Sequence, residues 1–350
     1  MKKTLFVMML LLSMFVRAGY AEDKELRIFT WSEYMDERKF SADFKKETGI
    51  NVKIDVYENN EDMLAKLQAG GVSQYDIIIP SDYIMSTLLA QKLIQPLNPA
   101  KIPNLKNIMP QFANTPYDPG NKYTAPWQWG TVGLMYNKNK VSAEAVKSWS
   151  VIFDPNKQVG TFWLMDSVRD TMAMALMYLG YDMNSTNPQE IKKAAELLIT
   201  AKNSKNCRGF KPGVGGKNDV DAGAAAMAIV YNGDAMRAVM ADPKRLGFSI
   251  PKEGGEIWVD LMAIPAKAPH VDAAHKWINW ILEAKRGAML SNYNRYATPN
   301  QASIPYIMPK DKALDEIYPS AETMKRLHYS KDLGSANRIM DEAWTKVKSR

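Results

Sequence analysis

The sequence of 350 residues predicts an α/β protein with mainly parallel sheets, divided into two domains. Short apolar runs alternate with amphipathic stretches along the chain, which is the pattern of strands and helices in α/β domains. The length indicates two domains, because roughly 330 residues remain after a leader and exceed what one core usually organises. No internal repeat or low-complexity segment breaks this alternation.

The first 21 residues have the features of a secretory signal peptide. Lys2 and Lys3 precede an apolar run over 4–16 that is too short to span a bilayer, and small residues lead to a cleavage site after Ala21. No later stretch reaches the roughly 18 uninterrupted apolar residues of a transmembrane helix. We therefore expect a soluble, exported protein.

The charge balance of the mature chain is mild. Removing the signal peptide takes away Lys2, Lys3 and Arg17 but no acid, so 45 basic and 38 acidic residues become 42 and 38, a net charge of about +4. The basic residues are scattered along the chain, which does not favour nucleic acid as a partner. Cys207 is the single cysteine, and we expect an inert structural thiol and no internal disulfide.

Three strand-and-helix pairs are expected in the first part of the mature chain. Their apolar residues alternate or run together in the strands and recur at helical spacing in the helices. We place strands at 26–30, 50–57 and 75–80, and helices at 36–48, 60–68 and 83–91. Gly49 follows the first helix and is expected to end it as a C-cap, since glycine adopts the left-handed conformation readily. A loop-rich stretch over 98–126 comes next.

The second part of the chain continues the alternation. We expect strands at 130–138, 224–231 and 256–265, and helices at 170–179, 188–201, from 235 onward, 272–284, and over the tail from 321, which closes with 341–348. Trp277 and Trp280 lie on the apolar stripe of their helix, so we assign them to the core.

Unusual polar and aromatic residues gather where the predicted strands end. In open α/β sheets, ligands bind outside the carboxyl ends of the strands. Such groups stand at 31–34 (WSEY), 80–83 (PSDY), 165–170 (MDSVRD), 231–234 (YNGD) and 258–260 (WVD), and PWQWG at 126–130 adds two tryptophans in a loop. Trp258 and Asp260 lie two apart on one strand and therefore on one face, where a lone buried aspartate is costly without a cationic partner.

A purely structural role is also open for several of these residues. Short polar side chains before a helix often accept hydrogen bonds from its first amides. Five residues could cap the helices that follow them in this way: Ser81, Asp82, Asp166 or Ser167, and Asp234. Arg169 could then pair with Asp170 at the surface.

Together, the groups predict a cleft lined by aromatic faces and carboxylates. This lining suits an organic ammonium ligand, because rings cover methylenes and make cation–π contacts worth roughly 0.5–2 kcal/mol each. Carboxylates accept charge-assisted hydrogen bonds from the –NH3+ ends. A phosphate ligand is not expected, because GVGG at 213–216 lacks the strand and helix context of a dinucleotide fingerprint and no Walker loop is present.

Catalysis has little support in the sequence, and we expect no enzyme, no metal and no cofactor. No GxSxG elbow is present, and the serine-containing groups have no base beside them. None of the three histidines stands in a metal-ligand spacing: His270, His275 and His328. A pair of acids for glycoside hydrolysis stays open as an alternative, drawn from Asp260, Glu33, Asp170 and Asp234.

Five segments carry a family resemblance. TWSEY, YENNEDMLAKL, YDIIIPSDY, IPKEGGEIWVDLMAIP and YATPNQAS, in this order and spacing, resemble the periplasmic polyamine-binding proteins of bacterial ABC importers, the spermidine/putrescine receptors. The resemblance covers essentially the whole mature chain and is specific in combination. It implies a type II periplasmic binding-protein fold, with ligand between two hinged α/β lobes. Lobe 1 would be 24–131 plus 259–304, and lobe 2 would be 132–258 plus 305–348.

The resemblance also implies a set of ligand-binding residues. Its aromatic members would form the walls of the site, and its carboxylates, Asp260 above all, would hold ammonium groups. The set is Trp31, Ser32, Glu33, Tyr34, Ser81, Asp82, Tyr83, Ser167, Asp170, Tyr231, Asp234, Trp258, Asp260, Tyr296 and Ser330.

Differences from the family bear on ligand length. Spermidine-preferring members resemble one another in two acids where this chain has Ser167 and Asp170, and in an amide where it has Ser330. Asp234 resembles the putrescine-preferring branch. A missing carboxylate would weaken the capture of a third amine by ~1–3 kcal/mol. We therefore expect putrescine first and spermidine second.

The resemblance implies a periplasmic solute receptor that closes around a polyamine and delivers it to an inner-membrane ABC permease. We expect a monomer with no nucleic-acid partner and no cofactor. Two alternatives stay open. One is a receptor of the same fold for another cationic solute, such as agmatine, a cationic amino acid or a ferric ion; the other is a secreted hydrolase.

Overall fold

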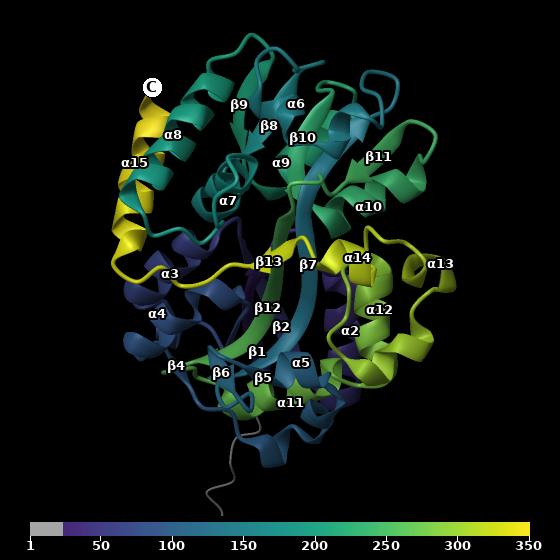
Figure 1. Cartoon of the computed structure of the whole chain (residues 1–350). Helices are drawn as coiled ribbons and strands as arrows, with labels where there is room; N and C mark the ends of the chain where they lie inside the picture. Colours follow the sequence, from purple (N-terminus) through teal and green to yellow (C-terminus); the bar gives the residue numbers. More distant parts are fainter. Residues whose placement is uncertain (1–23) are drawn as a thin grey trace, which may run out of the picture.

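The structure, a computed structural model, describes residues 24–350, and the predicted signal peptide falls outside them. Two α/β lobes are joined by two long strands, β7 (Thr124–Asn137) and β12 (Gly255–Pro265), which run side by side from one lobe into the other (Figure 1). The two strands pair in antiparallel fashion, and every residue of both is buried. The two-lobed α/β fold predicted from the sequence is confirmed.

The first lobe is built on a parallel arrangement around β1. Strand β1 (Glu25–Trp31) pairs with β2 (Asn51–Tyr57) on one side and β3 (Ile77–Ile78) on the other, and β3 leads on to β12. β4 (Ile94–Gln95) pairs with the end of β12. The longer helices of this lobe are α2 (Glu37–Thr48), α3 (Asn60–Gln68), α4 (Met85–Ala90), α11 (Val271–Ile281) and α12 (Ala284–Asn294).

The second lobe extends the same sheet beyond β7. Strand β10 (Met227–Tyr231) pairs with β7 in antiparallel fashion and with β8 (Phe162–Met165) in parallel, and β8 pairs with β9 (Cys207–Lys211). β11 (Leu246–Ser249) adds to β7. The longer helices here are α7 (Val168–Tyr178), α8 (Pro188–Lys202), α9 (Gly213–Asp221), α10 (Asn232–Ala241) and α15 (Ala336–Ser349). The C-terminal α15 packs beside α8 (Figure 1).

Short elements complete the fold. They are α5 (Pro110–Ala113), β5 (Asn114–Thr115), β6 (Asp118–Pro119), α6 (Ser150–Phe153), α13 (Pro309–Lys312), α14 (Ala321–Met324) and β13 (Leu327–Tyr329). Among residues 24–350, none of the helices combines the length and the apolar content needed to cross a bilayer. The lobe boundaries near 131 and 258 stay a prediction.

Several local signals act as expected. Asp36 caps α2 by accepting a hydrogen bond from the amide of Lys39 at 3.0 Å, and Gly49 ends that helix with a φ of 76°. Trp277 and Trp280 lie in the core, with 0% and 5% of their surface exposed. Cys207 is a free, half-buried cysteine, and burial raises the pKa of its thiol, which fits the inert role predicted for it.

The loop expected around PWQWG is instead part of a strand. β7 begins at Thr124, so Trp127 and Trp129 are buried inside it. Pro126 made the stretch resemble a loop, because proline removes a donor from the ladder. The register between β7 and β12 shifts between Asp260 and Leu261, and Leu261 is the partner of Pro126. This irregularity accommodates the proline inside a central strand.

The sequence pattern predicted a helical tail from Ala321, but the structure shows that this tail is not continuously helical. Strand β13 interrupts it and pairs in parallel with the start of β12, and α15 begins only at Ala336. Pairing with a strand about 70 residues earlier in the chain overrides the local helical pattern here.

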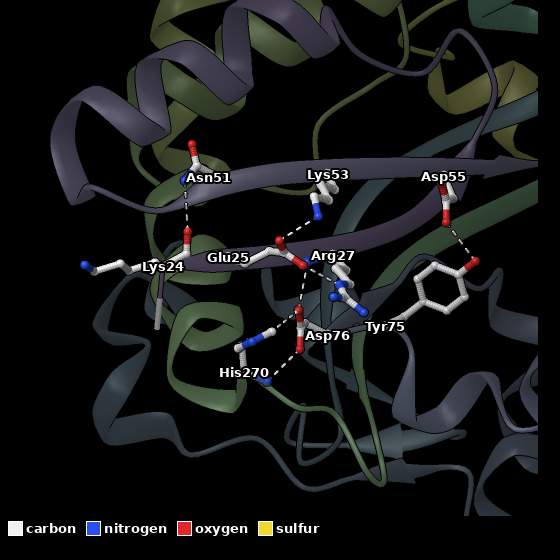
Figure 2. A network of polar contacts seen from close by, with 9 residues as sticks. All are labelled: Lys24, Glu25, Arg27, Asn51, Lys53, Asp55, Tyr75, Asp76 and His270. Carbon is white, nitrogen blue, oxygen red and sulfur yellow. Dashed lines mark hydrogen bonds and ion pairs between the residues drawn. The ribbon is translucent and has the colours of Figure 1, made fainter. Parts of the chain in front are cut away.

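A polar network fixes the amino end of β1, at the edge of the sheet where this strand starts (Figure 2). The buried Asp76 accepts hydrogen bonds from the amides of Arg27 at 2.8 Å and His270 at 2.7 Å. Its carboxylate also lies 3.0 Å from Nδ1 of His270. Glu25 forms ion pairs with Arg27 and Lys53. These contacts hold β1 and the loop before α11 together, which positions the opposite, carboxyl end of β1.

Candidate ligand-binding site

The described residues form a cavity at the place where the carboxyl ends of β1, β3, β8 and β10 face the middle of β12. The space between its lining residues and at its open mouth amounts to about 680 Å³. Most of the residues predicted from the sequence line it. They are Trp31, Ser32, Tyr34, Ser81, Tyr83, Ser167, Asp170, Tyr231, Asp234, Trp258, Asp260 and Tyr296.

Six lining residues were not predicted: Glu58, Asn59, Asn60, Gly213, Val214 and Glu256. Three predicted residues do not line the cavity: Glu33, Asp82 and Ser330. Glu33 and Ser330 contact other residues of the protein, and Asp82 is buried behind the cavity wall.

The end of β1 supplies one wall. The indole Nε1 of Trp31 donates to the carbonyl of Ile79 at 2.9 Å, and its ring lies 4.7 Å from that of Tyr57. These contacts fix the orientation of the Trp31 ring at the cavity. Ser32 and the buried Tyr34 follow in the turn before α2. The strand therefore ends in side chains that face the cavity, which explains why they differ from core residues.

Asp260 lies at the centre of the site and is 4% exposed. Its two carboxylate oxygens accept hydrogen bonds from the hydroxyls of Tyr34 at 2.6 Å and Ser81 at 2.7 Å. A β-bridge between residues 81 and 260 brings Ser81 into place, and Ser81 makes no side-chain cap to the helix that follows. Burial raises the pKa of Asp260 to about 7, although the two hydroxyls oppose this shift.

Aromatic rings surround this carboxylate. The ring centroid of Trp258 lies 4.9 Å from that of Tyr296 and 5.9 Å from that of Tyr231, in both cases edge to face. Tyr34 lies 5.6 Å from Tyr296. A Cβ on Gly233 would collide with the Tyr296 ring, so this close approach depends on glycine. The cavity thus has the aromatic walls that the sequence predicted.

Asp234 follows at the start of α10 and is buried. The cap of this helix does not come from a side chain, so the capping role considered for Asp234 is not observed. Burial raises the pKa of Asp234 to about 6, while the nearby Lys217 and Tyr296 counteract the shift. This carboxyl group thus has a cationic neighbour within the protein.

Ser167 and Asp170 lie at the start of α7. Ser167 caps the helix, with the amide of Asp170 donating to its hydroxyl at 3.5 Å, and still lines the cavity. Asp170 accepts a hydrogen bond from the hydroxyl of Tyr231 at 3.0 Å. Arg169 is buried and donates to the carbonyl of Lys331 at 2.6 Å. The surface pair between Arg169 and Asp170 that a structural role would require is therefore not formed.

Glu33 was predicted to face a ligand ammonium group, and in the structure its carboxylate pairs with cations of the protein. Its backbone has a φ of 53°, in the left-handed region, and its side chain does not line the cavity. The carboxylate pairs instead with Lys217 at 3.0 Å and Arg237 at 3.4 Å, which belong to α9 and α10 of the other lobe. The carboxylate of Glu33 therefore has two cationic partners within the protein, and its contact with a ligand stays a prediction.

Asp82 and Ser330 lie behind the wall of the cavity. Asp82 is 2% exposed, and burial together with the Asp260 charge raises the pKa of its carboxyl well above its usual range. The hydroxyl of Ser330 donates to Oε1 of Glu256 at 2.6 Å. Neither residue lines the cavity, and Ser330 is connected to it through its hydrogen bond to Glu256.

Glu256 is a buried carboxylate that sequence reasoning missed, as it missed Glu58. It lies on β12, two residues before Trp258 and four before Asp260, so all three side chains emerge on one face of the strand and line the cavity. The same alternation that identified Trp258 and Asp260 would have identified Glu256. The residues described include no cluster of three or more metal-ligating side chains.

Comparisons with known proteins place the chain in a family. It matches the family of bacterial extracellular solute-binding proteins over residues 39–316. It is 33% identical over 345 residues to the spermidine/putrescine-binding periplasmic protein of Escherichia coli strain K12, covering 97% of this chain and 96% of that protein. The putrescine-binding periplasmic protein PotF of the same strain is 34% identical over 348 residues, with 94% and 92% covered.

Solved structures show the same relationship. The spermidine/putrescine ABC transporter substrate-binding protein PotD from Streptococcus pneumoniae is similar with a TM-score of 0.74 at 29% identity, covering 93% of this chain and 100% of that one. The Tp0655 (TpPotD) lipoprotein of Treponema pallidum gives a TM-score of 0.81 at 27% identity with the same coverage. The resemblance drawn from the sequence is thereby confirmed, and the chain belongs to the bacterial extracellular solute-binding protein family.

Proposed function

We propose that this chain is a periplasmic receptor that binds a polyamine between its two lobes and presents it to an ABC permease in the inner membrane. The observation that carries the proposal is the cavity itself, in which aromatic rings surround the buried carboxyl group of Asp260. The printed names of the relatives, which are polyamine-binding periplasmic proteins, support the same ligand class. The receptor works as a monomer, without catalysis, cofactor or nucleic acid.

The cavity suits a ligand that is apolar along its length and cationic at its amines. The rings of Trp31, Trp258 and Tyr296 present faces and edges to methylene groups and to ammonium groups. Carboxylates replace the water that an ammonium group loses when it enters, since a buried charge without a partner is costly. Tyr34 and Ser81 already hold Asp260 in position, so the binding geometry is preorganised.

Binding and transport follow from the two lobes. A ligand that contacts residues of both lobes favours the arrangement in which they approach each other. The bound, closed receptor is then the form that the permease recognises. The predicted signal peptide supports export to the periplasm, where this exchange takes place.

A ligand screen tests the function. Purified mature protein is heated with putrescine, cadaverine, spermidine, agmatine or arginine, and the melting temperature is measured. We expect the polyamines to raise it most, because ligand that binds only the native state stabilises that state. Calorimetry then gives affinities for the ligands that shift it. Stabilisation by arginine alone, or by none of the five, would contradict the proposal.

A further inference from the structure

We propose that Glu256 and Asp170 together bind one ammonium group of the ligand, and that Glu256 thereby suits the cavity to a polyamine with three amines. The inference deepens the polyamine-binding function proposed above and rests on it. It assigns a specificity-determining role to a residue of β12 that the sequence motifs did not single out.

The position of Glu256 points to a ligand. The residue is 1% exposed, yet it lines the cavity. The hydroxyl of Ser330 holds Oε1, whereas Oε2 is buried and accepts no hydrogen bond from a donor in the described residues. A buried carboxylate oxygen without a donor is costly, so Glu256 carries a proton until a cationic donor arrives from the cavity.

Asp170 completes the pair. It also lines the cavity, and its Oδ2 accepts a hydrogen bond from Tyr231. Burial, the charge of Asp170 and a hydrogen bond with Asp170 raise the pKa of Glu256 well above its usual range, so Glu256 keeps a proton as long as no cation is near. Without a cation, two neighbouring buried carboxyl groups do not both ionise readily. An ammonium group between them would allow both to be charged.

Within residues 24–350, no ion pair joins Glu256 or Asp170 to a cation of the protein. The charge of Arg169 acts on Glu256, but its guanidinium donates to Lys331 and Asn337 and lies 5.4 Å from the Tyr83 ring centroid. The positive charge of Arg169 lowers the pKa of Glu256. Among the described residues, however, Arg169 donates no hydrogen bond to that carboxylate. At the other carboxylates the situation differs, because Lys217 lies beside Asp234.

Ligand length follows from the distribution of carboxylates. Asp260 also faces the cavity, whereas Asp234 already has the charge of Lys217 beside it. The expectation of putrescine first rested on Asp234 and Ser330, and also on Ser167 leaving one carboxylate missing next to Asp170. Glu256 supplies that carboxylate from a different strand, so we expect spermidine to bind more tightly than putrescine.

The experiment compares the wild-type mature protein with Glu256→Gln, which keeps the shape of the side chain and removes its charge. Calorimetry measures the dissociation constants for spermidine and putrescine at pH 7.5. We expect the variant to lose affinity for spermidine about tenfold or more, and for putrescine by less than about threefold. Glu322→Gln is the matched control, because Glu322 is exposed and pairs only with Lys325 at the surface, and it should change neither constant.

Two further variants keep the test decisive. Asp170→Asn removes the other half of the pair and should lower the spermidine-to-putrescine preference in the same way, even where Glu256→Gln fails to fold. Ser330→Ala removes only the donor behind Glu256 and should give a smaller loss in the same direction.

The outcomes separate this inference from the function on which it rests. Wild-type protein that binds neither polyamine overturns both. Polyamine binding with an unchanged preference in the folded Glu256→Gln or Asp170→Asn protein overturns the inference and leaves the function standing. A wild-type preference for putrescine also overturns it.

Discussion

At the scale of single residues, Asp260 shows how a carboxylate is prepared for a cation. Its two oxygens accept from Tyr34 and Ser81, which come from turns after two different strands. The hydroxyls orient the carboxylate but bring no positive charge, so the group keeps its capacity to bind an ammonium ion. Its pKa of about 7 reflects burial that a bound cation would offset.

Replacing Asp260 by asparagine is expected to weaken polyamine binding by about tenfold or more, because the amide keeps the shape but loses the charge that the ammonium group requires. Calorimetry on the folded variant measures this loss. Asp82→Asn serves as the matched control, since Asp82 is buried nearby but does not line the cavity. Equal losses in both variants would show that general electrostatics, and not direct contact, explains the effect.

Among single residues, the sequence was least informative about Glu33. The motif correctly located the end of β1, and Trp31, Ser32 and Tyr34 do line the cavity. The direction of Glu33, however, depends on Lys217, which lies 184 residues further along the chain. Local sequence contains no information about such a partner, whereas Trp258 and Asp260 were found because strand alternation alone places them on one face.

At the scale of elements, the start of α10, directly after β10, packs against the ring of Tyr296 from the other lobe. Tyr296 packs against Trp258 and sits directly over Gly233, the second residue of α10. Asn232, the first residue of that helix, accepts a hydrogen bond from the amide of Thr131 on β7 at 3.0 Å. The Asn-Gly pair therefore both fastens the helix to β7 and leaves room for the ring.

Gly233→Ala is expected to lower polyamine affinity by about tenfold, because the added methyl group displaces the Tyr296 ring and with it one wall of the site. Titration followed by tryptophan fluorescence would measure both affinity and the environment of Trp258. The control is Ala235→Gly, a substitution in the same helix α10. Gly223→Ala would not serve, because a side chain at the φ of 76° of Gly223 is strained. Full affinity in Gly233→Ala would exclude a role for this close packing.

Elements formed by distant pairing were harder to predict than elements with strong local patterns. The strands and helices of 25–91 follow apolar periodicity and recognisable caps. β13, in contrast, exists because residues 327–329 add to β12, and Trp127 and Trp129 are in a strand because β12 accommodates Pro126. These outcomes depend on partners that a local pattern does not reveal.

At the scale of the whole molecule, the protein encloses several carboxyl groups at the junction of its lobes. Burial raises the pKa of Asp260 to about 7 and of Asp234 to about 6. In the folded state these groups keep protons that the unfolded chain releases above about pH 4. Their contribution to stability is therefore fully present at low pH and is lost as the pH rises through 6 and 7.

A bound polyamine should reverse this trend, because it stabilises the ionised carboxylates. We expect spermidine to raise the melting temperature more at pH 8 than at pH 5.5, measured at one ligand concentration by calorimetric scanning. The difference between the two pH values should shrink in Asp260→Asn, which no longer titrates. An equal shift at both pH values would mean that these carboxyl groups do not exchange a proton for the ligand.

Strand β12 has a consequence for how such receptors diversify. It carries Glu256, Trp258 and Asp260 into the cavity, and the same eleven residues run through both lobes. Exchanging one lobe for that of a relative would therefore cut through the recognition surface. New ligand preferences in this lineage are more accessible through point substitutions on the inward face of one strand than through recombination of whole lobes.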